Sequence, residues 1–106
     1  MPDLPVYEDD FQTTVIETAE AFGWEHIYHT HDSRRSREGF PDLVLIRVKG
    51  GVGELMVLEL KGNPPSGRGT LSKNQAAWIT AFKAVPGVKS AAVWPEDMKR
   101  LEGDLK

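Results

Sequence analysis

The apolar residues at the start of the chain recur at the spacing of an α-helix. Phe11, Val15 and Phe22 fall on one stripe of residues 8–22, and a glycine follows as a typical helix end. On a helical wheel Glu8 falls beside this stripe, so its carboxylate can lean towards the core. An acidic residue in the first turn also stabilises the helix dipole, and helical spacing alone leaves both roles of Glu8 open.

Two apolar runs further along the chain predict a β-hairpin. Residues 43–46 and 55–60 flank a Gly-Gly pair that favours a two-residue turn. In that register Arg47 faces Glu54, and an opposite-charge pair across two strands supports the alignment. Gly53 is a position where a bulge would shift the pairing by one residue.

The remaining segments complete one α/β domain over residues 1–106, a mixed β-sheet flanked by helices in the order α-β-β-β-α-β-α. Aromatic and β-branched residues predict the first strand, a capping box starts the second helix, and a proline starts the last helix. These segments are a strand at 24–31, a helix from Ser72 to Val85-Pro86-Gly87, a strand at 88–94 and a helix at 95–101.

Three charged residues of the hairpin fall on one face. In the predicted register Asp42 lies opposite Glu59, with their Cβ atoms about 5 Å apart, and Lys61 shares that face. Charged strand residues usually face water, which is the plain alternative for each of them alone. Two carboxylates beside apolar strands repel each other unless a cation lies between them, so the set favours a site for one hard divalent cation.

Gln75 has a structural explanation, because it completes the capping box with Ser72. Its amide would nevertheless project from the helix N-terminus. A polar group there is suited to orienting an anion or an attacking water near the two carboxylates.

Composition narrows the classes of function. The chain has 106 residues, of which 40% are hydrophobic and 27% charged, as in ordinary folded domains. It contains no cysteine, which excludes disulfides, thiolate metal sites and a cysteine nucleophile. The sequence shows neither a signal-peptide pattern nor a segment suited to span a membrane. We therefore expect a cytoplasmic location.

The charge distribution is uneven. The net charge is −3, yet residues 34–73 hold eight Lys or Arg against four Asp or Glu, and the rest of the chain holds five against twelve. A basic middle predicts a local surface for a polyanion, and arginine forks suit phosphate oxygens. Turn-forming residues at 62–70 predict a mobile surface loop with an arginine at its tip. The candidate contacts to a nucleic-acid backbone are His29, Arg34, Arg35, Arg37, Arg68 and Lys73, with plain packing as the alternative for His29.

Taken together, these motifs resemble the PD-(D/E)XK nuclease superfamily, through Pro41-Asp42, then Glu59-Leu60-Lys61 after a hairpin, with a glutamate in the preceding helix. More narrowly, nearly the whole chain is similar to the VRR-NUC subfamily, whose stand-alone members of this size occur in phages and bacteria. The segments that carry the similarity are Glu8-Asp9-Asp10-Phe11-Gln12, Gly23-Trp24, His29, Ser33-Arg34, Gly39-Phe40-Pro41-Asp42-Leu43, Glu59-Leu60-Lys61, Leu71-Ser72, Gln75, Trp78 and Val93-Trp94.

The resemblance implies a restriction-endonuclease-like fold and metal-assisted hydrolysis of a DNA phosphodiester. Lys61 would orient or activate the attacking water and stabilise charge that develops on phosphorus, and Gln75 would position water or phosphate. No catalytic residue of the family pattern is missing. The implied ligands of one or two Mg²⁺ or Mn²⁺ ions are Glu8, Asp42, Glu59 and the backbone carbonyl of Leu60.

The similarity also implies a type of substrate. Small stand-alone members resemble Holliday-junction resolvases, which act as homodimers because two symmetric nicks need two sites. Trp94, Met98 and Leu101 would either form such a dimer interface or complete the core. A monomeric flap or nicking nuclease and a DNA-binding module without hydrolysis are the alternatives.

Overall fold

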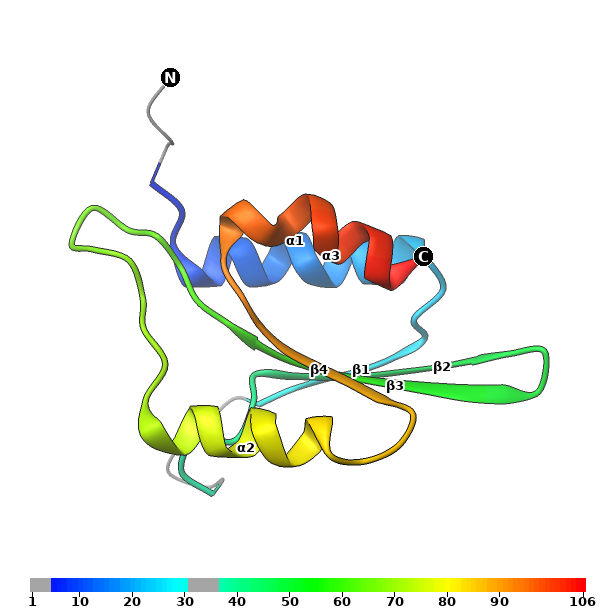
Figure 1. Ribbon diagram of the computed structural model, residues 1–106. Coiled ribbons are helices and arrows are strands. Elements are labelled where there is room, and N and C mark those ends of the chain that lie inside the picture. Colours follow the sequence, from blue (N-terminus) through cyan, green and yellow to red (C-terminus); the bar gives the residue numbers. More distant parts are fainter. Residues whose placement is uncertain (1–4, 31–36) are drawn as a thin grey trace.

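The computed structural model (Figure 1) describes residues 5–30 and 37–106, and within them a four-stranded sheet lies between helices. The order of elements matches the predicted α/β fold. In chain order the elements are α1 (Glu8–Ala21), β1 (His26–His29), β2 (Leu43–Lys49), β3 (Val52–Leu60), α2 (Lys73–Lys83), β4 (Val88–Val93), the 3₁₀ helix η1 (Pro95–Asp97) and α3 (Met98–Leu105).

The sheet is mixed, with its strands in the order β1-β2-β3-β4. The first three strands are antiparallel, and β4 runs parallel to β3. A parallel pair needs a crossover connection, and α2 supplies it on one face of the sheet. Helices α1 and α3 lie together on the other face (Figure 1). The start of β2 and the end of β3 therefore lie between two helical layers.

The predicted hairpin register is confirmed. Arg47 faces Glu54, and Gly50 and Gly51 take the positive φ angles of 60° and 79° that the tight turn requires. Gly53 pairs with Val48 inside the ladder, so no bulge shifts the alignment. Each side chain of the hairpin consequently lies on the face that the sequence predicted.

The ends of two other elements differ from their predicted positions. The strand expected at 24–31 is limited to His26–His29, because Trp24 turns into the core with 1% of its surface exposed. The last helix, expected to end at Leu101, continues to Leu105, which is fully buried. In both cases burial of an apolar side chain decides where the element begins or ends.

The core lies between the sheet and the α1–α3 layer. Phe11 and Val15 of α1 are buried, as their helical spacing predicted, and Ala19 is buried beside them, while Phe22 is partly buried against the same cluster. Leu101 of α3 is also buried in this cluster, and Met98 packs against it. Of the two roles considered for Met98 and Leu101, the structure therefore shows the one in which they complete the core.

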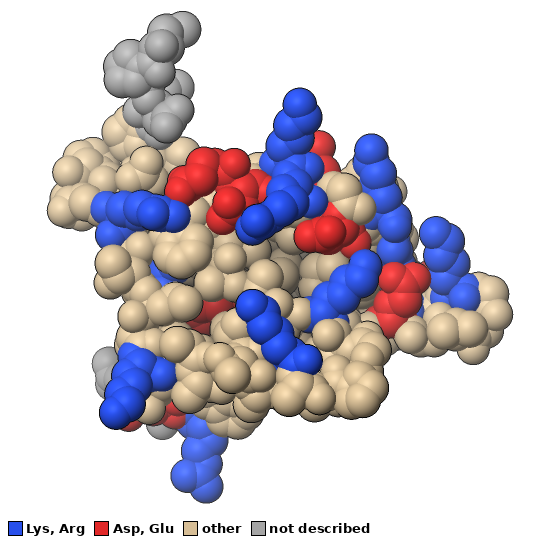
Figure 2. All heavy atoms as spheres, viewed as in Figure 1, with Lys and Arg blue, Asp and Glu red and all other residues tan. Residues whose placement is uncertain are grey.

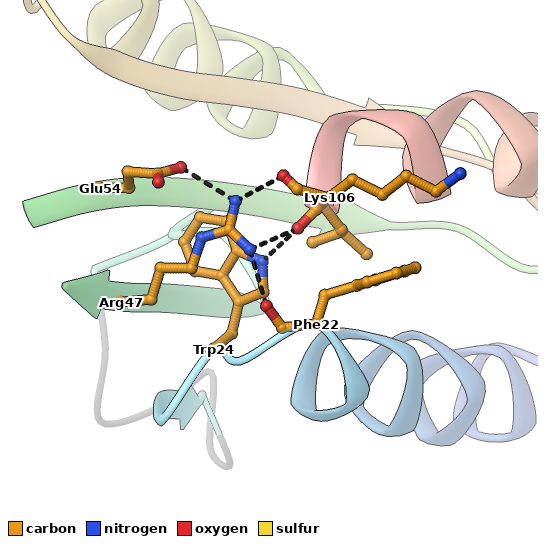
Figure 3. Close-up of polar contacts among 6 residues, drawn as sticks. Phe22, Trp24, Arg47, Glu54 and Lys106 are labelled. Carbon is orange, nitrogen blue, oxygen red and sulfur yellow. Dashed lines mark hydrogen bonds and ion pairs between the residues drawn. The ribbon is translucent and has the colours of Figure 1, made fainter. Parts of the chain in front are cut away.

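A buried arginine joins three parts of the chain near the turn end of the hairpin (Figure 3). Arg47 is 5% exposed, and its guanidinium carbon lies 4.3 Å from the centre of the Trp24 ring. The hydrogen bond to Glu54 lowers the pKa of that carboxyl. The acceptors for Arg47 are the backbone oxygens of Phe22 (2.8 Å), Leu105 (2.7 Å) and Lys106 (2.8 Å) and the carboxylate of Glu54 (3.2 Å).

Candidate active site

The two hairpin carboxylates come together where β2 begins and β3 ends. The Oδ2 atom of Asp42 accepts a hydrogen bond of 2.8 Å from the backbone N–H of Leu60. Glu59 is 2% exposed, and its Oε2 is buried without a hydrogen-bond partner among the described residues. A buried polar atom that lacks a partner is costly, and either a bound cation or a proton shared with Asp42 would satisfy this oxygen.

The pair of Asp42 and Glu59 carries more negative charge than the nearby positive charge offsets. Burial, followed by hydrogen bonding and charge repulsion with Asp42, raises the pKa of Glu59 from 4.5 to about 9. The positive charge of Lys61 opposes this rise and does not cancel it. At neutral pH Glu59 therefore holds a proton unless another positive charge reaches the site.

Lys61 and Gln75 both point at the same carboxylate. The Nζ atom of Lys61 lies 3.9 Å from Oε1 of Glu59, and the lysine side chain is 12% exposed. The amide nitrogen of Gln75 donates a hydrogen bond of 3.2 Å to that same oxygen. Oε1 of Glu59 thus accepts one hydrogen bond and lies near the ammonium of Lys61, whereas Oε2 accepts no hydrogen bond from the described residues.

The predicted capping box positions Gln75. The backbone N–H of Gln75 donates to the Ser72 hydroxyl at 3.1 Å, and its side-chain oxygen accepts from the Ser72 N–H at 2.9 Å. With the oxygen used in the cap, the NH₂ group remains for Glu59. The two roles considered for Gln75 are therefore compatible in one side chain.

Glu8 comes to the site from the other helical layer. It is the first residue of α1 and is exposed. Partial desolvation of its carboxyl, followed by the charge of Asp42, raises the pKa of Glu8, while Lys61 lowers it. The carboxyl of Glu8 thus interacts electrostatically with Asp42 and Lys61 of the hairpin, although Glu8 lies at the surface.

Two glycines allow the helices to approach the site. A Cβ atom on Gly62 would lie 2.7 Å from the backbone nitrogen of Glu8, and one on Gly39 would lie 2.7 Å from that of Gln75. Backbone atoms at these distances cannot move aside easily, so only glycine fits. In the sequence Gly39 is recognisable only as part of a motif and Gly62 only as a turn former of the 62–70 loop, because close approaches between distant segments leave no local pattern.

The oxygen-rich set suits a hard divalent cation, although the side chains do not form a finished coordination sphere. Over residues 5–30 and 37–106, no three His, Asp or Glu side chains stand close enough together to hold a metal ion as they are placed. Mg²⁺ commonly uses one or two carboxylates and keeps several waters, so a complete protein cage is not required. Asp42 and the unpartnered oxygen of Glu59 fit that mode of binding.

The structure places some of the predicted DNA contacts and not others. Arg34 and Arg35 lie outside the described residues, whereas Arg37 and Lys73 are exposed. The amide nitrogen of Gln12 lies 2.9 Å from Nε2 of His29, so that His29 contacts α1 one turn after Glu8. This contact was not predicted, since it joins residues 17 positions apart.

Arg68 is engaged with the protein itself. It pairs with Glu96 at 2.6 Å and lies over the ring of Trp94 at 4.5 Å. The indole N–H of Trp94 donates to the carbonyl of Gly69 at 2.7 Å, which holds the 62–70 loop against the end of β4. Trp94, considered as a dimer residue, contacts this loop.

Basic residues do not dominate the face seen in Figure 2. Lys and Arg side chains are spread over it singly, with Asp and Glu between them. Acidic atoms are also visible deep in the gap between the upper and lower parts of this face. An anion bound on this face would therefore meet dispersed cations.

The chain was compared with known proteins. The family model for the VRR-NUC domain matches residues 8–93, from the first residue of α1 to the end of β4. No curated protein and no solved structure matches the chain. The residues of the site that fall inside the matched stretch are Glu8, Asp42, Glu59, Lys61 and Gln75.

Proposed function

The chain belongs to the VRR-NUC family, a family of nucleases, and we propose that it is a Mg²⁺- or Mn²⁺-dependent endonuclease that hydrolyses DNA phosphodiester bonds. One observation carries the metal dependence: Glu59 is buried with an unpartnered oxygen beside a second carboxylate. A nuclease needs positive charge next to the phosphate it cleaves, and this site is short of positive charge.

The residues that would hold the cation are Asp42 and Glu59, with Glu8 and the backbone carbonyl of Leu60 completing the set. When bound, a divalent cation lowers the pKa of water and neutralises charge on the scissile phosphate. Asp42 is already oriented by the Leu60 N–H, and Glu59 by Gln75. The chain thus fixes its ligands before substrate arrives, which limits the entropic cost of binding.

Lys61 and Gln75 would act on the reacting groups. The ammonium of Lys61 is largely shielded from water and lies beside Glu59, so its charge is little screened. We assign it the stabilisation of charge on the phosphate and the orientation of the attacking water. Gln75 would hold Glu59 in place and, through that carboxylate, the water.

The test is a cleavage panel with the full chain. Four-way junction, flap, nicked and linear duplex DNA are each incubated with Mg²⁺, with Mn²⁺ or with EDTA. We expect strand cleavage with either metal and none in EDTA. Full activity in EDTA would rule out a metal-dependent nuclease. DNA binding without cleavage under every condition would favour a binding module instead.

We further propose that the preferred substrate is branched DNA cut by a homodimer, as the similarity to Holliday-junction resolvases suggests. Paired symmetric nicks in the four-way junction, with a solution mass twice the 11.8 kDa of one chain, are the expected results. Light scattering at micromolar concentration measures the mass. A mass of one chain, with single cuts in flap or nicked DNA, would support the monomeric alternative.

A further inference from the structure

One part of the sheet carries apolar side chains that no helix of the described residues covers. On the face that bears α2, this helix packs chiefly over β3 and β4. Val44, Ile46 and Val48 alternate along β2 on that face, and Ile46 and Val48 are 40% and 63% exposed. Tyr28 of β1 is 61% exposed and pairs with Val44. An uncovered apolar strip of this kind usually marks a contact surface.

The strip forms a shallow hollow rather than a flat surface. Its volume is ≈ 320 Å³, and one side is made by β1 and the other by β2. Two of the residues that line it, His26 and Tyr28, carry flat rings. The residues that line it are Glu25, His26, Ile27, Tyr28, Val44 and Ile46.

The hollow lies next to the candidate active site along β2, since Val44 is two residues from Asp42. The backbone N–H of Thr30 donates to the backbone carbonyl of Asp42 at 2.9 Å, so the pairing of β1 with β2 extends to Asp42. Since Tyr28 pairs with Val44, Asp42 is its diagonal neighbour on the same face, about 7 Å away between Cβ atoms. Tyr28 thus lies one step along the sheet from Asp42, at which the scissile phosphate would bind.

We propose that Tyr28 is a specificity residue that stacks on an unpaired base of the nucleotide next to the scissile phosphate, with Val44 and Ile46 as the floor of the base site. This proposal rests on the nuclease function proposed above. A base that has left its helical stack offers a flat apolar face, which an exposed tyrosine ring can cover. Stacked duplex offers no such face, so the contact would favour junctions, flaps and gaps.

A base fits the hollow better than a second protein chain does. A stable protein interface involves about 20–30 residues and about 800 Å² on each partner. Six residues line this hollow, and only Tyr28 and Ile46 among its large apolar side chains are strongly exposed. The occupant should therefore be small, flat and held next to Asp42, as a flanking nucleobase would be.

The experiment combines Tyr28 variants with substrates that lack single bases. Single-turnover cleavage of a flap substrate is measured for the wild type, Tyr28→Phe and Tyr28→Ala, with an abasic nucleotide placed on either side of the cleaved phosphate. We expect Tyr28→Ala to cleave the intact substrate about 5- to 150-fold more slowly, the range for one stacked base. Tyr28→Phe should stay within about twofold of wild type, since it keeps the ring.

The decisive result is the combination of the two changes. At one of the two positions the abasic nucleotide should slow the wild type as much as Tyr28→Ala does, and it should add nothing to the loss in Tyr28→Ala. Losses that multiply, or a Tyr28→Ala enzyme as fast as wild type, would overturn the proposal. Val85→Ala, which trims an exposed apolar residue beyond α2, is the matched control and should leave the rate unchanged.

A binding measurement separates this proposal from the nuclease proposal. The same DNA with 2-aminopurine at the sensitive position, or at each flanking position in turn if no cleavage occurs, is titrated with protein in EDTA. Quenching by wild type and Tyr28→Phe but not Tyr28→Ala supports stacking even if no strand is cut, while equal signals from all three contradict it. A dimer that Tyr28→Ala turns into a monomer, with abasic DNA cleaved at the normal rate, would assign the hollow to a second chain instead.

Discussion

Two buried charged residues of one hairpin, Arg47 and Glu59, have different polar surroundings. Arg47 donates to four oxygens and lies on the Trp24 ring, and its partner Glu54 carries the opposite charge. Glu59 has the carboxylate of Asp42 as its neighbour, and one of its oxygens has no partner among the described residues. Glu54 and backbone oxygens offset the charge of Arg47, although its Nε is also buried without a hydrogen-bond partner among the described residues. Around Glu59 the described residues bring more negative than positive charge.

We infer from this difference that Arg47 has a structural role and Glu59 a functional one. A buried charge with its partners in place fixes how segments of the chain meet, as Arg47 does for the ends of α1 and α3. A buried charge without them raises the energy of the folded chain, and it persists where a ligand supplies what is missing. The residue types alone would not tell the two apart, whereas their partners do.

The largest effect should come from removing the proposed catalytic residues. Asp42→Ala and Lys61→Ala should each reduce the rate of DNA cleavage by about 10²- to 10⁴-fold or more, because each removes a group that we propose to act on the reacting atoms. Circular dichroism should show that both variants keep their fold. A folded Asp42→Ala variant that cleaves at the wild-type rate would end the assignment of this site.

Removing the charge of Arg47, which Glu54 neutralises, should instead lower the stability of the folded chain. Arg47→Met takes away the donor for the part-buried carbonyls of Phe22 and Lys106 and one of the two donors to Leu105, and we expect a loss of about 3 kcal/mol in the free energy of unfolding. Urea denaturation measures it. Below the unfolding transition the variant should still cleave DNA; a selective loss of cleavage without a loss of stability would show that the two sites are coupled.

Close packing at the active site gives a smaller effect. Gly62→Ala should cost about 1–3 kcal/mol and slow cleavage, because its Cβ would press on the backbone at Glu8. Gly103→Ala is the matched control, since nothing lies within 4 Å of its Cβ and alanine favours the helix. Thermal melts and rates of both variants make the comparison, and equal behaviour of the two would refute the packing argument.

The pH dependence of stability should show the charge imbalance. The pKa of Glu59 is about 9 in the folded chain and near 4.5 when unfolded, so the folded chain binds this proton more tightly. That contribution is complete below pH 4.5 and is lost as the pH rises towards 9. Without metal, the wild type should lose about 1–3 kcal/mol more than Glu59→Gln between pH 5 and pH 8, measured by urea denaturation. Parallel pH profiles for the two proteins would contradict the raised pKa.

The sequence was informative wherever local rules decide the outcome. The hairpin register followed from the two-residue turn, and the capping box placed Gln75 at the N-terminus of α2. Helical spacing identified Phe11 and Val15 as buried residues. Together with the resemblance, these rules suggested the order of elements and the residues to be considered for the active site.

Contacts between distant segments were not predictable in the same way. Trp24 read as a strand residue, and only the fold shows that its indole N–H meets the carbonyl of Leu105. The burial of Arg47, predicted only as a cross-strand partner, depends on that same distant segment. Arg68 was expected at the tip of a free loop, yet its guanidinium lies on Trp94. Such contacts depend on tertiary packing, which no local pattern encodes.

The central claim is that the Asp42–Glu59 pair lacks a positive charge that a divalent cation supplies. The most direct measurement is isothermal titration of Mn²⁺ into the metal-free protein at pH 8, with Glu59→Gln as the comparison. Saturable binding by wild type, with release of a proton and loss of binding in folded Glu59→Gln, is the predicted result. Equal Mn²⁺ binding by both proteins, or none by a wild type that still cleaves DNA, would contradict the account.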